Sequence, residues 1–488
     1  MPSPSRFPRL IAAVAAFGLL AGACAGERPT VEESGALREV TVEQETPTTA
    51  RPAETEVRLI RLAVGAAWVG DPADAGPTSV ANRVLAGLLH EGLTAVDANG
   101  EIVPALAERW FVSDDRLQWT FVLPEGLTDN IDVPLTARDV KASLERIAAR
   151  GAADQSVASL RAIRGWDDFV AGDSGGASGI AAPDDATLVF TLDLPFEPLG
   201  AVLADPAFGI TGVLDDGTVR TTGAYRYASD TMLEAVDPAA TVAEVELVRV
   251  DGNGAALLAS GRVDWAVLSP RDISEAVPGS IVRQPLELRT GIVVRLADEG
   301  QRRAVLGALN GAELALDLAN ATVAVSPGVS GPVSELPDSL VVHVPAGPLA
   351  GLASELEAQL SATGMRVDVQ IVGASAFAAA VADGVAVVFP MVVAGNGFVR
   401  STGVAASLPG GPDDVFGLDD EVRAELVASL WAERDAAQRS LLLATAEAQL
   451  RETAVWLPVA DAEVRIGLGA DMTPLRVLPD GTLDLSGF

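Results

Sequence analysis

The chain of 488 residues carries 67 acidic and 34 basic side chains, which gives a formal net charge of −33 at pH 7. Such an acidic chain would be repelled by phosphate backbones, which are bound by clustered lysine and arginine, so nucleic-acid binding is excluded. The length exceeds the roughly 250–300 residues at which a single hydrophobic core stops growing, and we therefore expect at least two lobes.

The amino terminus has the pattern of an export signal. Arg6 and Arg9 precede the apolar run "LIAAVAAFGLL", which is shorter than the about 20 apolar residues that span a membrane. Cys24, the only cysteine, follows this run and three small residues, and this resembles a bacterial lipobox, in which the cysteine is lipidated. We expect a lipoprotein signal peptide over residues 1–23 and a lipid on Cys24 that anchors the protein to the extracytoplasmic face of the bacterial cell membrane. The alternative is a free cysteine at the end of a signal anchor.

Residues 24–57 are rich in Glu, Thr and Pro and contain almost no large apolar side chains. A segment of this composition cannot bury enough apolar surface to offset the entropy of ordering, so we expect a flexible, charge-extended tether. An anchor, a tether and a large body are together typical of a surface-held receptor or a surface-held enzyme.

Hydrophobic periodicity predicts the first elements of the body. An alternating apolar run at residues 57–64 ends in a turn rich in Gly, Asp and Pro and predicts a strand. The next segment predicts a helix from about residue 80, because apolar residues recur there at helical spacing; these residues are Val80, Val84, Leu85, Leu88 and Leu89. A short helix is then expected to present Ala105, Leu106 and Trp110, and "LQWTFVL" predicts a strand after the turn "SDD".

A further amphipathic helix is predicted in "PLTARDVKASLERI". Thr136 stands where a helix-capping hydroxyl is favoured, and Asp139 follows as the acidic third residue of the first turn. The segment therefore carries its own start signal.

Several stretches of this half resemble one protein family. They are "LLHEGLTAVDANGEIVPALAERWFVSDD", "WTFVLPEGL", "PLTARDVKASLERI", "TTGAYRY" and "ALLASGRVDWAVLSP". This set is similar to the family-5 extracellular solute-binding proteins, which are the oligopeptide-, dipeptide- and nickel-binding receptors of ABC importers. The resemblance is dense from about residue 60 to residue 270.

The resemblance implies an α/β fold of the two-lobe periplasmic-binding-protein type (type II, Venus-flytrap), with mixed sheets and a hinge between the lobes. Residues 58–284 would form lobe I, residues 285–455 lobe II, and residues 456–488 would return to lobe I. The lobes of a monomer would close around a small molecule or peptide and deliver it to an ABC permease complex, without catalysis and without a cofactor or metal. The alternative is a divergent protein of the same fold that acts as a sensor or binding partner without transport.

The second half resembles the family less, but its periodicity still predicts elements. A helix is expected in "EGQRRAVLGALNGAELALDLA", and a strand, a helix and a strand are expected between residues 339 and 372. A helix pair followed by a strand that returns to lobe I is expected in "SLWAERDAAQRSLLLATAEAQLRETAVWLPV".

One stretch bears on the ligand. Peptide-binding members of the family carry an aromatic residue and an aspartate that holds the ligand's ammonium group. In this chain the matching positions are Val392, Val393, Ala394, Gly395 and Asn396. Because a buried ammonium needs a carboxylate or several acceptors in place of water, either another acid substitutes or the ligand is not a free-amine peptide. The missing acid favours the alternative without transport.

Tryptophans supply the remaining candidates. Trp68 follows the first predicted strand, and ligands of open α/β sheets lie at the carboxyl ends of strands, so we expect Trp68 to line the cleft. Core packing is the alternative for this residue. Trp110, Trp119 and Trp456 have apolar neighbours and are expected in the core.

The letters GDSGG at residues 172–176 match the surroundings of the nucleophilic serine in trypsin-like proteases. A serine nucleophile needs a histidine base that a carboxylate orients, but His90 lies in a predicted helix end and His343 in an apolar strand-like run. In the family this part of the chain is a variable surface loop. We therefore predict that Ser174 lies in a loop and is not catalytic, and a hydrolase that uses Ser174 is the remaining alternative. The distance between the two histidines in the sequence also argues against a histidine-rich nickel or zinc site.

Overall fold

The computed structural model describes most of the chain beyond residue 57. The described residues are 58–65, 80–150, 160–213, 219–250, 254–268, 281–316, 318, 321–324, 334–347, 349–394, 415–416, 421–469, 472, 476–478 and 482–485. All of them belong to the unit Thr55–Phe488. The predicted signal peptide, Cys24 and the predicted tether lie outside the described residues, so these expectations stay predictions.

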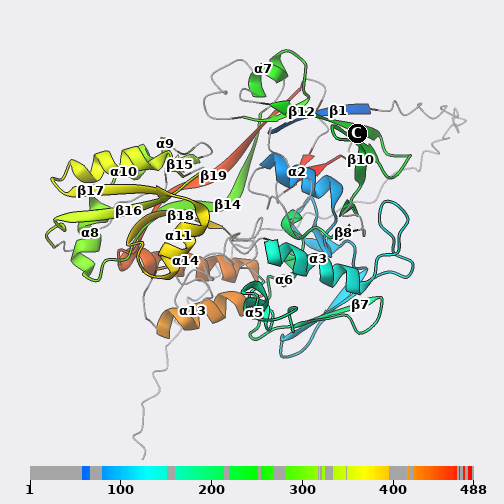
Figure 1. Ribbon diagram of the computed structural model, residues 1–488, viewed down its shortest axis with the longest axis horizontal. Coiled ribbons are helices and arrows are strands. Elements are labelled where there is room, and N and C mark those ends of the chain that lie inside the picture. Colours follow the sequence, from blue (N-terminus) through cyan, green and yellow to red (C-terminus); the bar gives the residue numbers. More distant parts are fainter. Residues whose placement is uncertain are drawn as a thin grey trace, which may run out of the picture. The chain divides into compact units, whose positions relative to one another are not determined.

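A mixed sheet of eleven strands forms the frame of this unit (Figure 1). Its neighbouring strands are, in order, β10 (Tyr225–Ser229), β11 (Met232–Ala235), β12 (Val242–Val250), β1 (Arg58–Gly65), β13 (Trp265–Val267), β19 (Trp456–Leu468), β14 (Ile281–Val294), β18 (Val388–Ala394), β16 (Ser339–Pro345) and β17 (Arg366–Val372), and β15 (Ala321–Ala324) adds to β19. Strand β1 lies parallel to β12 and β13, and β16 lies parallel to β17 and β18. From β13 through β19 and β14 to β18, neighbouring strands are antiparallel.

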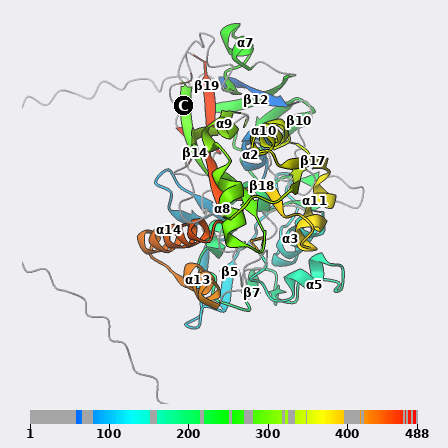
Figure 2. The ribbon, with the colours of Figure 1, turned by 90° about the vertical axis from the view of Figure 1, so that its left-hand side faces the viewer.

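Strands β14 and β19 are the longest of the sheet, with 14 and 13 residues, and Figures 1 and 2 show them side by side. The first part of β14 pairs with the last part of β19, which also carries β13, and the last part of β14 pairs with both β19 and β18. Between these parts the register shifts, from Pro285 to Arg289. Such an irregularity lets a ribbon of two strands bend locally. The predicted boundary between residues 284 and 285 falls at this shift, and the division into lobes stays a prediction.

A second sheet has four strands, in the order β4 (Arg109–Val112), β5 (Gln118–Val122), β7 (Thr187–Thr191) and β6 (Ile180–Ala181). Along β5 and β7, buried residues alternate with more exposed ones, because successive side chains of a strand point to opposite faces. The buried face shares one core with α3 (Ala137–Arg150), to which Val140 and Leu144 belong.

The start of α3 confirms the predicted cap. The amide of Thr136 donates to the Asp139 carboxylate at 2.8 Å, and the amide of Asp139 donates to the Thr136 hydroxyl at 3.4 Å. This reciprocal pair satisfies two amides that the first turn of a helix leaves without intrahelical partners.

The remaining elements are short strand pairs and helices. The pairs are β2 (Thr94–Val96) with β3 (Ile102–Pro104), β8 (Gly212–Val213) with β9 (Val219–Arg220), and β20 (Arg476–Val477) with β21 (Leu483–Asp484). The helices are α2 (Val80–Leu89), α5 (Trp166–Val170), α6 (Leu199–Val202), α7 (Gly254–Ala259), α8 (Glu299–Gly307), α9 (Gly311–Leu316), α10 (Leu352–Ser361), α11 (Ala374–Ala382), α13 (Glu421–Ala432) and α14 (Ala436–Glu452), with a 3₁₀ turn η1 (Pro206–Phe208). None of the described helices has both the length and the apolar character needed to cross a membrane.

Most predicted elements are confirmed. The predicted helix from residue 80 is α2, the strand, helix and strand after residue 339 are β16, α10 and β17, and the helix pair with its following strand is α13, α14 and β19. The segment expected as one helix from residue 299 is divided into α8 and α9.

The short helix expected around Trp110 is wrong. Trp110 lies in β4, opposite Phe121 of β5. The amides of the preceding residues Leu106 and Ala107 donate to the carbonyls of Gly92 and Leu93, each at 3.1 Å. These bonds to a distant segment take the amides that a helix would need, so tertiary contacts outweigh the local apolar pattern.

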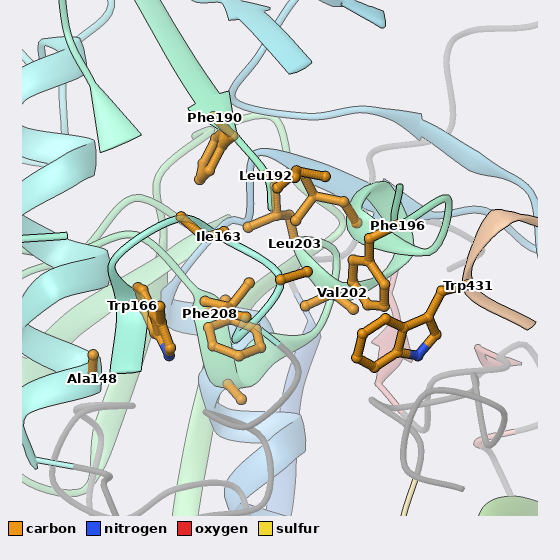
Figure 3. Close-up of a cluster of buried hydrophobic side chains, with 14 of the residues drawn as sticks. Ala148, Ile163, Trp166, Phe190, Leu192, Phe196, Val202, Leu203, Phe208 and Trp431 are labelled. Atoms are coloured by element: carbon orange, nitrogen blue, oxygen red, sulfur yellow. The ribbon is translucent and has the colours of Figure 1, made fainter. Parts of the chain in front are cut away.

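Buried apolar side chains gather in separate clusters. The largest joins the four-stranded sheet, α3 and α5 to α13, α14 and parts of β14, β18 and β19, and Figure 3 shows a portion of it around Phe208. Trp119 and Trp456 are buried in this cluster, as predicted, and Trp110 packs against it while partly buried. A second cluster lies between β16, β18 and helices α8 to α10, and a third between β1, β12 and α2.

Gly291 of β14 is expected to reject any side chain. A Cβ there would come within 2.5 Å of the Leu457 carbonyl oxygen and of the Trp456 ring. Gly291→Ala should therefore lower the free energy of unfolding by about 1–3 kcal/mol, the usual cost of overpacking a core. Thermal and denaturant unfolding would measure it.

Gly307→Ala is the matched control, because a Cβ at the end of α8 would meet nothing within 4 Å beyond its own helix. This variant should be neutral or more stable by up to about 1 kcal/mol. Equal losses for the two variants would contradict the close packing at Gly291.

Candidate functional site

Part of the predicted ligand site lies at the end of β18. Val392 and Val393 pair with Thr290 and Arg289 of β14, and the Val392 side chain is partly buried. The end of β18 therefore lies directly beside the register shift of β14. The role of the two valines in binding stays a prediction. Outside the described residues lie Trp68, Gly395 and Asn396.

Arg289 binds two carboxylates at this point. Its Nε and Nη2 donate to the two carboxylate oxygens of Asp461 on β19, at 2.6 and 2.9 Å, and its Nη1 donates to Glu447 on α14 at 2.6 Å. The side chains of Arg289 and Glu447 are 12% and 13% exposed, whereas that of Asp461 is 34% exposed. Arg289 thus joins a carboxylate of β19 to a carboxylate of α14 beside the end of β18.

Sequence analysis did not identify this cluster. Arg289 lies 158 residues from Glu447 and 172 residues from Asp461, so no local spacing connects the three. The one available signal is an arginine within the apolar run "LELRTGIVV". Since charged side chains are rarely buried unless they are paired, an arginine in a central strand predicts acidic partners without naming them.

A pocket of about 970 Å³ lies elsewhere in the unit. Its walls come from the end of α2, the turn between β2 and β3, the segment before β12, and the residues around β21. The described residues that line it include four acids and neither lysine nor arginine. The volume is within the range of small-molecule sites, about 300–1,000 Å³, and the charges favour a cation over an anion. The four acids are Glu91, Asp97, Asp237 and Asp484.

This pocket is at the amino end of β1. Val242 lines the pocket and pairs with Arg58, the first residue of β1, in a parallel ladder that ends at Gly65. The cleft was expected at the carboxyl end of the same strand, which Trp68 follows in the sequence. The pocket is therefore distinct from the predicted cleft.

Among the acids that line the pocket, Glu91 has a raised pKa. Burial disfavours the charged form of its carboxyl group and lifts the pKa above the ordinary value of 4.5. Its backbone is fixed, because its amide donates to Thr222 Oγ1 at 3.0 Å and its carbonyl accepts from the Ile210 amide at 2.8 Å. Asp97 differs, since hydrogen bonds within its own turn, first that from the Glu101 amide, lower its pKa. A bound cation would therefore offset an unfavourable burial of charge at Glu91, whereas hydrogen bonds already stabilise the charge of Asp97.

Ser174 lies in an exposed turn, which confirms the loop prediction. Its Oγ donates to the Gly176 carbonyl at 2.9 Å rather than to a base. His90, after α2, and His343, in β16, are both buried. In the part of the chain that the structure describes, no group of three or more His, Cys, Asp or Glu side chains could hold a metal ion.

Glu91→Gln should stabilise the protein at neutral pH. The folded state holds the Glu91 proton more tightly than the unfolded state, so this carboxyl favours folding fully below its ordinary pKa of 4.5. That contribution is lost as the pH rises through the higher pKa of the folded state. The melting temperature of the variant should exceed that of the wild type at pH 7, and the difference should shrink at pH 4.

Asp298→Asn is the control of opposite sign. The Gln301 amide donates to Asp298 at 2.7 Å at the start of α8 and lowers the pKa of this carboxyl. The Asp298 carboxylate therefore stabilises the fold above its ordinary pKa, and this stabilisation is lost as the pH falls. The variant should be less stable than the wild type at pH 7. A Glu91→Gln effect that does not change between pH 7 and pH 4 would show that burial of the charge is not its cause.

Arg289→Met should destabilise the fold by about 3 kcal/mol, because it leaves two carboxylates together without their cation. Arg226→Met is the control, since Arg226 pairs with Glu234 at 2.7 Å with both side chains more than 40% exposed. The loss there should stay below about 1 kcal/mol. Denaturant unfolding of both variants would measure the difference. Similar losses in the free energy of unfolding would mean that the Arg289 cluster contributes no more than the exposed pair.

Comparisons with known proteins cover this chain unevenly. Residues 101–276 match the family described as bacterial extracellular solute-binding proteins, family 5 Middle. The chain is 29% identical over 147 residues to the probable peptide ABC transporter periplasmic-binding protein y4tO of Sinorhizobium fredii, which is 30% of this chain and 24% of that protein. It is 33% identical over 142 residues to the probable deoxycholate-binding periplasmic protein YgiS of Escherichia coli, 28% of this chain and 26% of that protein. The matches thus span about a quarter of each relative.

The fold extends much further than the sequence match. The structure of Haemophilus influenzae OppA in complex with the peptide RPPGFSPFR superposes with a TM-score of 0.66 at 17% identity, covering 88% of this chain and 98% of that one. This likeness confirms the predicted α/β, periplasmic-binding-protein-like fold with mixed sheets. The relatives named here are binding proteins and not enzymes. Over residues 101–276 the chain is thus similar to the bacterial extracellular solute-binding proteins of family 5.

Proposed function

We propose that the protein is an extracytoplasmic solute receptor that closes two lobes around a small solute, with peptides as the leading class, and delivers it to an ABC import permease. The observation that carries the proposal is the family match over residues 101–276 within a fold that is shared over 88% of the chain. In such a receptor, a ligand shifts the balance between open and closed forms by its difference in affinity for the two. A lipid on Cys24 would hold the receptor at the cell surface.

The proposed hinge is the ribbon of β14 and β19. These strands join the part of the sheet around β1 and β12 to the part around β16 and β18, and their register shift lies between the two parts. Bending at this shift would change the angle between the parts while most ladder hydrogen bonds persist. The proposed lobes are therefore residues 58–284 with the return segment 456–488, and residues 285–455.

We place the ligand's positive charge, where a ligand has one, at Asp461. The predicted stretch from Val392 to Asn396 has no acid, but Asp461 lies close to it, because Arg289 pairs with Val393 on one side and with Asp461 on the other. Of the two carboxylates, Asp461 is the more exposed, at 34% against 13% for Glu447. A buried ammonium needs such a carboxylate to replace water.

Native mass spectrometry of the protein purified from its own cells tests the receptor proposal directly. A retained peptide or other small solute, with recovery of binding after the solute is stripped and returned, is the expected result. A protein that carries no solute and that no member of a di- to pentapeptide panel stabilises against heat would overturn the peptide proposal.

Asp461→Asn tests the placement of the charge. By calorimetry it should weaken binding of a free-amine tripeptide by at least about tenfold, or about 1.4 kcal/mol, and leave the affinity of the N-acetylated tripeptide unchanged. Glu447→Gln is the matched control, because it removes the other carboxylate from the same arginine. If Asp461→Asn weakens both peptides equally, the residue acts through the fold and not on the ammonium.

A second candidate function is a surface sensor or binding partner of the same fold that does not feed a transporter. The absence of an acid from Val392 to Asn396 favours it. A solute-free protein that still captures a defined partner protein from the cell envelope would support this function over transport.

A further inference from the structure

Two segments that lie far apart in the sequence meet at one aromatic pair. Phe196, which precedes α6, stands edge-on to Trp431 near the end of α13, with ring centroids 5.4 Å apart and an interplanar angle of 81°. Figure 3 shows the two rings side by side. Phe196 is 1% exposed and Trp431 4%. Edge-to-face geometry of this kind is favourable beyond the burial of area.

Polar groups surround the pair. The amide of Glu197 donates to the Trp431 carbonyl at 2.8 Å. The Glu197 carboxylate, whose side chain is only 12% exposed, lies 3.3 Å from Nε of Arg116 and 3.1 Å from Nε of Arg434. Nη1 of Arg116 donates to the Ala432 carbonyl at 2.7 Å. These charge-assisted contacts tie the turn between β4 and β5 and the segment before α6 to the junction of α13 and α14.

Arg116 has an unusual backbone. Its φ is 60°, in the left-handed region that glycine and asparagine adopt with little cost and other residues adopt with strain. The turn itself needs no arginine at this position. What an arginine adds there, and a glycine would not, is the contact with Glu197 and Ala432. Strain of this kind persists where the surrounding contacts compensate for it.

The contact joins the two proposed lobes. Arg116, Phe196 and Glu197 belong to residues 58–284, and Trp431 to Arg434 belong to residues 285–455. The ribbon of β14 and β19 connects the same two parts through the sheet. If the ribbon bends as a hinge, segments that meet away from it must separate when the lobes open.

The indole of Trp431 opposes the contact. Its Nε1 is buried and has no hydrogen-bond partner among the residues that the structure describes. Burying an N–H group without a partner costs free energy that water repays once the group is exposed. The aromatic pair and the ion pairs of Glu197 therefore hold the contact together despite the free-energy cost of the buried indole N–H.

We propose that Arg116, Phe196, Glu197, Trp431 and Arg434 form a latch between the lobes, which holds the protein without solute partly closed and sets how often it opens. The inference rests on the proposed closure of two lobes. Because only the open form admits solute, the latch lowers the rate of association, and weakening it raises the open population.

Distances between spin labels on Asp230 and Glu357, measured by pulsed electron paramagnetic resonance, test the latch without any solute. Both positions are exposed, one in the turn between β10 and β11 and the other on α10. The labels are attached to cysteines introduced at these positions in the full chain with Cys24→Ser, so that no other thiol reacts.

Two variants weaken the latch in different ways. Arg116→Gly removes two of its contacts and also relieves the left-handed strain, so its melting temperature should not fall, and Glu197→Gln weakens both arginine bridges. Each should broaden the distance distribution toward longer values and raise the association rate of a bound solute by at least about threefold. Arg164→Gln is the control, because Arg164 pairs with Asp193 inside one proposed lobe, and it should change neither quantity.

The possible outcomes separate the latch from the receptor function. Unchanged distances in both latch variants would overturn the latch, and binding of solute by those same proteins would leave the receptor function standing. Longer distances in both variants, in a protein that binds no solute from the panel, would support the latch and overturn the receptor function. Equal changes in the Arg164→Gln control would also overturn the latch.

Discussion

The antiparallel pairing of β14 with β19 is the interaction on which the rest of this structure depends. The ladder on one side of the sheet reaches β19 through β13, and the ladder on the other side reaches β14 through β18. Removing either strand would divide the sheet into two parts. The pairing also tolerates little change, because Gly291 leaves no room for a Cβ against Trp456 and the Leu457 carbonyl. A close-packed ribbon whose register shifts lie between Pro285 and Gly291 combines a firm link with a defined place to bend.

Charge in this molecule is organised around its few basic groups. With 67 acids and 34 bases, the carboxylates outnumber the basic groups about two to one, so a buried arginine can be surrounded by more than one acid. Arg289 between Asp461 and Glu447 is such a case, beside the end of β18. At Glu197 the ratio is reversed, since two arginines share one carboxylate. Both arrangements hold segments that are distant in the sequence together through charge-assisted contacts.

The pocket at the amino end of β1 and the predicted cleft at its carboxyl end are separate places. The backbone of Glu91 in the pocket is held between Thr222 and Ile210. Burial raises the pKa of its carboxyl group. This acid therefore contributes to the dependence of the protein's stability on pH.

The sequence alone determined most local elements and the resemblance to one family. Helix α2 follows from apolar spacing, the cap of α3 from Thr136 and Asp139, and strand β5 from alternation, because each of these signals lies within a few residues. It failed at Trp110, where amides that a helix would use are bound to carbonyls of Gly92 and Leu93. Only the tertiary structure decided which charges meet, since Arg289 lies 158 and 172 residues from its partners and Arg434 lies 237 residues from Glu197. No periodicity spans such separations, and long-range packing alone brings these groups together.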